Sequence, residues 1–247
     1  MLLMPNEPSI LIIAATQREI RAFRELVSVP APDTDPRIVC RGSAAGAGSR
    51  HLRLAISGIG KSNAAMHTLD LLHQEPASLV IDTGCAGAYP ESDLRLGDVT
   101  LSSASVFADE GVDIGSEFAD LQAMGLAIAR DPKGQELYNE MPTFLDPTWL
   151  PMPSLDFRVH SGIIATTSTC SGTRETARLR ARGALAEAME GAAVALAANE
   201  TGCPFVEVRG ISNEAGDRDH SRWDIDLACK NAARVVAHII NQLEAPA

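Results

Sequence analysis

Two glutamates and one asparagine are the residues whose types and positions best suit chemistry. Glu19 stands just past an apolar run, Glu190 lies among small residues in AMEGAA (188–193), and Asn213 follows a second apolar run. The small neighbours of Glu190 indicate a closely packed helix end, where a buried carboxylate needs donors such as the hydroxyls of a sugar diol. Glu19 and Asn213 also have ordinary structural explanations, because TQRE (16–19) forms a capping box and Asn is common in turns and at N-caps.

Two glycine-rich turns offer a place for a ligand. SGIG (57–60) and TGCAG (83–87) follow apolar strands, and ligands of open α/β sheets bind at the carboxyl ends of strands. Two ordinary tight turns explain these residues equally well. AISGIGKS (55–62) resembles a phosphate-binding P-loop, but Ala55 stands where the strict pattern needs Gly, and the loop is too short to wrap a triphosphate. No GxGxxG motif supports a dinucleotide site.

A polar run follows Asn213. EAGDRDHSR (214–222) is typical of a solvated loop, but Arg218, Arg222 and the adjacent Trp223 would also suit an anionic aromatic ligand. Cys170 and the six histidines form no pattern of nucleophile and base, and the motifs GxSxG and HExxH do not occur. The histidines are therefore interpreted as surface or core residues.

Strands that alternate with helices must position these side chains, which predicts an α/β layered fold. The run SILIIAA (9–15) is nearly continuous in apolar residues, as in a parallel strand that is covered on both faces. Further strands are expected at residues 52–57, 78–82, 98–107, 159–166 and 205–211, and helices at 17–27, 61–74, 173–182, 189–200 and 224–243.

Three other segments are expected to lack regular structure. Residues 83–88 are expected to form a loop after a strand, and residues 41–50 a loop of small residues. Five of the fourteen prolines fall between Pro132 and Pro153, so this stretch is expected to be an irregular surface excursion. It is too short to be a domain.

The composition excludes several classes of protein. The 247 residues carry 21 Lys and Arg against 32 Asp and Glu, a net charge of −11, which disfavours a nucleic-acid partner. No apolar stretch reaches the roughly 18 residues of a membrane span, and the N-terminus lacks the pattern of a secretory signal. The five cysteines include no CxxC pair, so neither disulfides nor a zinc site is indicated, and a cytoplasmic location is expected.

Taken in order, five stretches resemble the nucleoside phosphorylase/hydrolase superfamily, especially its nucleosidase branch. They are IIAATQREI, SGIGKSNAA, DTGCAGAY with LRLGDV, AMEGAAVA and PFVEVRGISN, and they span residues 10 to 213. Within the branch the sequence is most similar to the futalosine hydrolase family, on TTSTCSGT (166–173), AMEGAAVALAA (188–198) and VRGISNEAGDRDHSRW (208–223). The resemblance implies one domain (1–247) with three αβα layers and a mixed central sheet. It also implies hydrolysis of futalosine with release of hypoxanthine, in a bacterial route to menaquinone.

The resemblance also assigns expected roles to residues. Glu19 matches an acidic residue that holds the attacking water, and Met189 and Glu190 match a pair beneath the ribose, where Glu190 accepts both hydroxyls. Asn213 falls where adenine-specific nucleosidases have an Asp that protonates N7. An Asn is not an acid, so a 6-oxopurine, which leaves more easily than adenine, suits it better.

Further substrate-binding residues are implied in the two strands that flank the site. Arg209 matches a residue that orients the base-binding side chain. Cys85 stands where relatives usually have Ser, and Ala86, Gly87 and Ser212 lie beside these positions. The resemblance implies no metal and no organic cofactor, a small nucleoside as the substrate, and a homodimer or homotetramer.

Three alternatives remain open. A 5′-methylthioadenosine/S-adenosylhomocysteine (or aminodeoxyfutalosine) nucleosidase is the first, and a purine nucleoside phosphorylase is the second. A phosphorylase would need a cationic cradle for phosphate, and Glu19 at the water position disfavours it. The third is a nucleoside-binding protein without catalytic activity.

Overall fold

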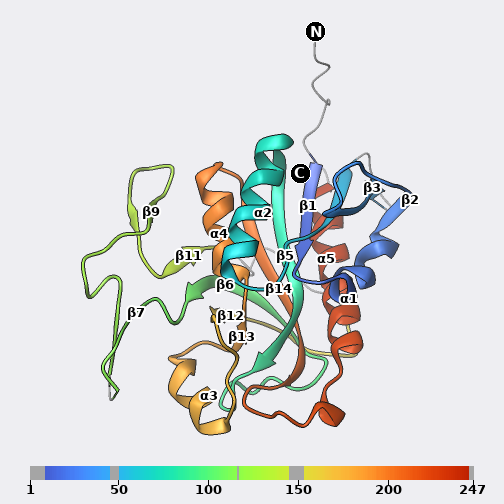
Figure 1. The fold of residues 1–247 in the computed structure, drawn as a ribbon. Coiled ribbons are helices and arrows are strands. Elements are labelled where there is room, and N and C mark those ends of the chain that lie inside the picture. Colours follow the sequence, from blue (N-terminus) through green and yellow to red (C-terminus); the bar gives the residue numbers. More distant parts are fainter. Residues whose placement is uncertain (1–8, 45–49, 116, 145–152, 245–247) are drawn as a thin grey trace.

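The computed structural model describes residues 9–44, 50–115, 117–144 and 153–244. Helices cover both faces of a ten-stranded sheet (Figure 1). This arrangement confirms the predicted three-layer α/β fold, and the sheet is mixed, as expected. No helix among the described residues is long and apolar enough to cross a membrane.

Four parallel strands form the centre of the sheet, and β5 pairs with both β1 and β14. A second parallel group, β6, β12 and β13, runs antiparallel to them. The main strands are β1 (Ser9–Ala14), β4 (His51–Ile56), β5 (Ala77–Ala88), β14 (Phe205–Glu214), β6 (Val99–Phe107), β12 (Val159–Thr166) and β13 (Ala186–Ala188), with β11 (Glu140–Pro142), β3 (Ile38–Ala44) and β2 (Val27–Ala31) towards the edges.

The helices pack on the sheet through apolar faces. One core lies under α5 (Ile225–Glu244), which buries Ala232, Val236 and Ile239 against the central strands. The other core lies under α2 (Lys61–Gln74) and the alanine-rich α4 (Gly191–Glu200), whose small side chains allow α2 and the sheet to approach closely. The remaining helices are α1 (Gln17–Ile20), the 3-10 helix η1 (Arg21–Leu26), α3 (Arg174–Ala181) and the 3-10 helix η3 (His220–Arg222).

Two predicted boundaries near the site were wrong. Residues 83–88 belong to β5 and not to a loop, because β13 and β14 pair with this end of the strand. Asn213 likewise lies inside β14 and not after it, because its segment continues to pair with Gly87 and Ala88. The sheet therefore extends to the residues that the sequence placed beyond it.

Other predictions were wrong further from the site. The predicted helix at 17–27 is divided into α1 and η1, and it ends at β2. The expected loop at 41–50 begins as part of β3, and residues 45–49 lie outside the described residues.

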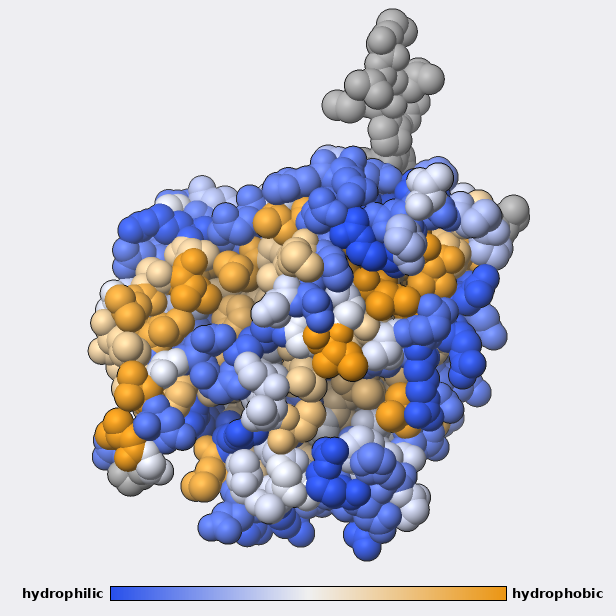
Figure 2. Space-filling view, in the orientation of Figure 1, coloured by the Kyte–Doolittle hydropathy of each residue, from blue (hydrophilic) through white to orange (hydrophobic). Residues whose placement is uncertain are grey.

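The proline-rich excursion begins earlier than its prolines and contains short strands. Two small sheets pair β7 (Gly111–Asp113) with β8 (Phe118–Asp120), and β9 (Ala129–Arg130) with β10 (Glu136–Leu137), before β11 joins the main sheet. Residues 145–152 lie outside the described part. Hydrophobic side chains gather on the side of the molecule where these strands lie (Figure 2); the exposed ones include Val112, Ile114, Met124, Leu126 and Ile128.

Candidate functional site

A cavity of about 470 Å³ lies beyond the carboxyl ends of β1, β5 and β14. The parallel direction of these strands brings residues from distant parts of the sequence to one edge of the sheet, as ligand sites of α/β proteins require. Nine predicted residues fall into two groups: Glu19, Cys85, Ala86, Gly87, Met189, Glu190, Ser212 and Asn213 line the cavity, and Arg209 does not.

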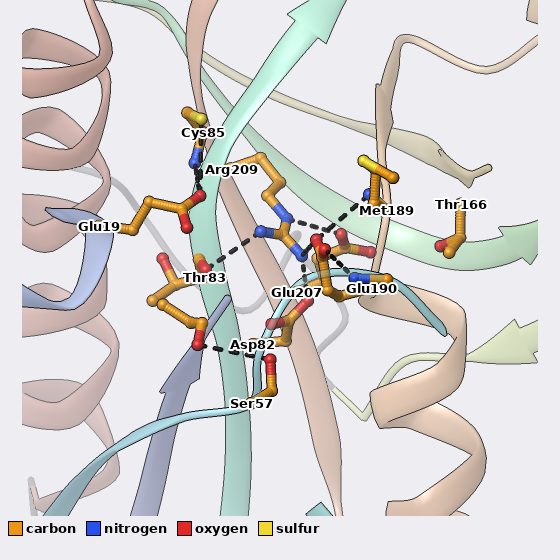
Figure 3. Close-up of polar contacts among 12 residues, drawn as sticks. Glu19, Ser57, Asp82, Thr83, Cys85, Thr166, Met189, Glu190, Glu207 and Arg209 are labelled. Atoms are coloured by element: carbon orange, nitrogen blue, oxygen red, sulfur yellow. Dashed lines mark hydrogen bonds and ion pairs between the residues drawn. The ribbon is translucent and has the colours of Figure 1, made fainter. Parts of the chain in front are cut away.

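Glu19 has both of the roles that its sequence suggested. Thr16 is the N-cap of α1: its Oγ1 accepts from the Glu19 amide at 3.3 Å and donates to Glu19 Oε2 at 2.8 Å. The other oxygen, Oε1, accepts from the amide of Cys85 at 3.2 Å (Figure 3). Gly84 makes room for this contact, because a side chain there would lie 2.5 Å from Glu19 Oε1. Glu19 is therefore a cap whose carboxylate also borders the cavity.

Glu190 stands between two helix starts. It occupies the N-cap position of α4, and its Oε1 accepts from the amide of Gly60, the N-cap of α2, at 2.8 Å. Gly58 and Gly60 have φ of +81° and +87°, so the turn that presents this amide needs glycine. Burial raises the pKa of the Glu190 carboxyl, while Arg209 and the N–H donors oppose the shift. The positive end of α2 also favours the carboxylate.

The hydrogen bonds of Asn213 fix the orientation of its amide. Ser212 Oγ donates to Asn213 Oδ1 at 2.7 Å, and Asn213 Nδ2 donates to the carbonyl oxygen of Glu214 at 2.9 Å. Since a carbonyl oxygen can only accept, the atom beside it must be the amide nitrogen. The second hydrogen on Nδ2 has no partner among the described residues, and Asn213 lines the cavity. At this position the cavity offers a donor.

Cys85 is a poor candidate for a nucleophile. Burial, reinforced by the neighbouring Glu19, raises the pKa of its thiol to about 12. At neutral pH the side chain is a neutral thiol, and its Sγ lies 3.5 Å from Glu19 Oε1. The backbone amide and the thiol of Cys85 both donate to Glu19 Oε1.

The expectation for Arg209 was wrong. Its fully buried guanidinium donates to Glu207, to the Thr83 carbonyl oxygen and to Asp82, and none of its described contacts is with Asn213. Asn213 lies four positions further along the strand than Arg209, a distance of about 13 Å in extended chain. The buried partners of Arg209 hold its guanidinium near Asp82 and Glu207. Its Nη2 lies 3.9 Å from Glu190 Oε2, so Arg209 supports the predicted sugar site instead.

At the outer end of the cavity, one of the two predicted arginines is in place. Arg218 lines the cavity with Trp223, and its guanidinium lies 4.9 Å from the centre of the indole ring. Arg222 does not line it, because this exposed side chain pairs with Asp217 and Asp219. The described residues of the excursion at 132–153 also lie outside the lining.

Sequence reasoning missed several cavity residues, and Glu187 is the most polar of them. Glu187 accepts from Ser171 through both the amide (2.7 Å) and the hydroxyl (2.6 Å). It lies in β13, whose length of three residues is too short for its apolar pattern to show in the sequence. Arg18 at the rim is paired with Asp226, which starts the final helix. The missed lining residues are Ala15, Thr16, Arg18, Ile59, Cys170, Ser171, Glu187, Ala188, Gly216 and Ile225.

A family model, described as the phosphorylase superfamily, matches residues 9–242. The chain belongs to the phosphorylase superfamily. A 5′-methylthioadenosine/S-adenosylhomocysteine nucleosidase of Chromohalobacter salexigens is 33% identical over 193 residues, which are 76% of this chain and 78% of that protein. A futalosine hydrolase of Thermus thermophilus is 35% identical over 188 residues, which are 74% of this chain and 79% of that protein.

Solved structures agree with this assignment to the phosphorylase superfamily. The methylthioadenosine/S-adenosylhomocysteine nucleosidase of Streptococcus pneumoniae, solved with a transition-state inhibitor, superimposes with a TM-score of 0.75 at 26% identity. The match covers 95% of this chain and 99% of the other. These members of the superfamily are nucleosidases, and the chain is an enzyme of the same kind, an N-glycosyl hydrolase.

Proposed function

We propose that this protein hydrolyses the N-glycosidic bond of futalosine, giving dehypoxanthine futalosine and hypoxanthine, as a step of menaquinone biosynthesis. The observation that carries the proposal is the donor that Asn213 presents to the cavity. Hypoxanthine has acceptors at N7 and O6 on one edge, and both suit an amide N–H. Adenine has a donor, its 6-amino group, beside N7, so an Asn213 N–H finds only one acceptor on that edge.

The sugar and the water have their own carboxylates in this proposal. Cleavage of a ribosyl–purine bond passes through an oxocarbenium-like state, as in glycoside hydrolysis. Glu190, with Met189 beside it, would bind the ribose hydroxyls and stabilise the positive charge that develops. Glu19 would align and deprotonate the attacking water. Its contacts with Thr16 and Cys85 hold the carboxylate in place at the cavity wall.

Water, and not phosphate, is the proposed attacking group. Lys61 stands beside the glycine turn, but it pairs with Asp109 and Glu110 at 2.6 Å each. Its charge is therefore balanced within the protein. Arg18 at the rim is likewise paired with Asp226. These contacts leave Lys61 and Arg18 little attraction for a phosphate ion, whereas a neutral water needs none.

A second candidate is hydrolysis of methylthioadenosine or S-adenosylhomocysteine, the reaction in the names of several relatives. The apolar side chains of Met189, Ile59 and Ile225 in the cavity would suit a thioether. Against it stands Asn213, because adenine is the poorer leaving group and benefits from an acid at N7.

The deciding experiment is a panel of futalosine, aminodeoxyfutalosine, inosine and methylthioadenosine, each assayed with and without phosphate. We expect futalosine to have the highest kcat/KM, with no dependence on phosphate. A preference for methylthioadenosine would establish the second candidate, and a requirement for phosphate would establish a phosphorylase. No turnover of any substrate would indicate a binding protein.

We also propose that the chain forms a homodimer or homotetramer. Ile59 and Met66, at the start of α2, are 58% and 57% exposed, and further apolar side chains are exposed between β7 and β10. Such patches mark surfaces that another protein covers. Light scattering coupled to gel filtration measures the mass directly, and a monomer at micromolar concentration would contradict this proposal.

The role of Glu19 is tested by Glu19→Gln. Gln keeps the backbone bond to Thr16, so the helix should still start correctly, but it cannot take a proton from water. We expect kcat to fall about 10²-fold, the usual effect of losing a general base. Thr173→Ala is the matched control, because Thr173 is the N-cap of α3 and is not among the residues that line the cavity, so its loss should cost only stability, about 1 kcal/mol. A Glu19→Gln enzyme with near-normal kcat and reduced stability would show that Glu19 is only a cap.

The role of Asn213 is tested by Asn213→Asp. Near neutral pH the new carboxylate would repel N7 and O6 of hypoxanthine, so kcat/KM for futalosine should fall. When protonated, the carboxyl can donate a proton to N7 of adenine, so activity on aminodeoxyfutalosine should rise, with an optimum at lower pH than in the wild type. The measurement is kcat/KM for both substrates from about pH 5 to 8. If the variant slows both substrates equally, Asn213 does not select the base.

The role of Arg218 is tested at the carboxylated aromatic end of futalosine. Arg218 has no ion pair among the described residues, so its charge is available to a carboxylate over Trp223. Arg218→Ala should raise KM for futalosine about 10-fold, which corresponds to about 1.4 kcal/mol, and leave KM for inosine unchanged. Arg222→Ala is the control, since Arg222 already pairs with aspartates outside the cavity. Equal changes for both substrates would assign Arg218 a structural role.

A further inference from the structure

A cluster of buried charges lies directly beneath Glu190. The side chains of Arg209, Asp82 and Glu207 are fully buried, and the guanidinium donates to both carboxyl groups (Figure 3). With Glu190 nearby, three acidic side chains surround one cation. Burial of unbalanced charge is costly, so it matters which of these acids pairs most closely with the Arg209 guanidinium.

Both carboxylate oxygens of Glu207 accept hydrogen bonds from buried partners. Its Oε1 accepts from Arg209 Nε at 2.8 Å, and its Oε2 accepts from the hydroxyl of Ser105. The same carboxylate lies against Gly191, the first residue of α4, where any side chain would overlap it. It therefore lies at the positive end of a ten-residue helix, which stabilises an anion.

Asp82 has the opposite surroundings. Arg209 donates to its Oδ2, but its buried Oδ1 has no partner among the described residues. Burial raises the pKa of the Asp82 carboxyl well above its usual range, and the nearby Glu207 and Glu190 raise it further against the effect of Arg209. Arg209 is therefore held from two strands: Glu207 is bound through both carboxylate oxygens, and Asp82 through one.

These contacts of Arg209 determine how closely its guanidinium approaches Glu190. Its direct donors are the amides of Gly60 and Met189, whereas Arg209 Nη2 stays at 3.9 Å. The acids that face it from other elements are Glu19 on α1 and Asp82 on β5. Among the described residues its only ion pair is this long one with Arg209, so much of its charge is available to a cation in the cavity.

We propose that Glu207 is a positioning residue for the nucleosidase reaction: it anchors Arg209 from behind and keeps the guanidinium from pairing directly with Glu190. The negative charge of Glu190 then faces the ribose and stabilises the oxocarbenium-like state. The inference rests on the proposed role of Glu190, which is the same for either candidate substrate. It places a functional residue in the core of β14, outside the cavity lining.

The test is Glu207→Gln, which keeps the shape and an acceptor for Arg209 but removes the charge. Arg209 should then pair with Glu190, lower its pKa and weaken its effect on the reacting sugar. We expect kcat to fall about 10-fold, the lower end of the range for partners that act through another residue, with KM changed much less. The acidic limb of the kcat profile should move to lower pH by about one unit.

Asp98→Asn is the matched control. Asp98 is also a buried acid bound to an arginine, Arg158, but its side chain is not among those that line the cavity. Its loss should lower the thermal midpoint and leave kcat and the pH profile unchanged. Ser105→Ala is a milder second variant, which removes one donor from Glu207 and should shift the acidic limb in the same direction by less.

The assays use futalosine, or methylthioadenosine if the wild type prefers it. An unshifted acidic limb with kcat within about 2-fold of wild type would overturn the inference while the proposed function stands. A kcat loss without any change in the pH profile would show that Glu207 only stabilises the fold. A wild type inactive on every nucleoside would overturn both proposals.

Discussion

One buried cation, Arg209, ties the central sheet to the cavity. A guanidinium without solvent must be balanced by acids in good geometry, because an unpaired charge in the core costs several kcal/mol. The balance comes from two adjacent strands, since Glu207 on β14 pairs in register with Asp82 on β5. A shift of that register by one residue would turn each of these side chains to the opposite face. The pairing of β5 with β14 therefore also places Arg209 beside Glu190.

The cavity is assembled from the ends of elements and not from their middles. Glu19 is near the start of α1, Glu190 precedes α4, and Gly60 precedes α2. Helix starts offer unpaired N–H groups, and both glutamates are placed where such groups or strand amides hold a carboxylate. A carboxylate held in this way keeps its position without a neutralising ion pair, which is what a site for a developing cation requires.

Much of this arrangement could be predicted from the sequence, because the hydrophobic periodicity of a helix or strand depends only on neighbouring residues. The helix at 61–74 and the strand at 159–166 have the predicted bounds, and Glu19, Glu190 and Asn213 all line the cavity. The extension of β5 through Thr83–Ala88 was missed, because glycines usually weaken a strand. Here pairing with β13 and β14 keeps these residues in the strand. The partners of Arg209 were missed for a related reason: Asp82 is 127 residues away along the chain.

Under the proposed function, the charges around the cavity would orient a substrate with a cationic transition state and an anionic tail. The inner wall carries Glu19 and Glu190, which face the place where positive charge would develop. Arg218 stands at the outer end over an indole ring, and the second rim cation, Arg18, is already balanced by Asp226. In the proposed reaction, a nucleoside with a carboxylated aromatic group would place its sugar beside Glu19 and Glu190 and its carboxylate beside Arg218. A small neutral thioether would use the inner wall and leave Arg218 without a partner.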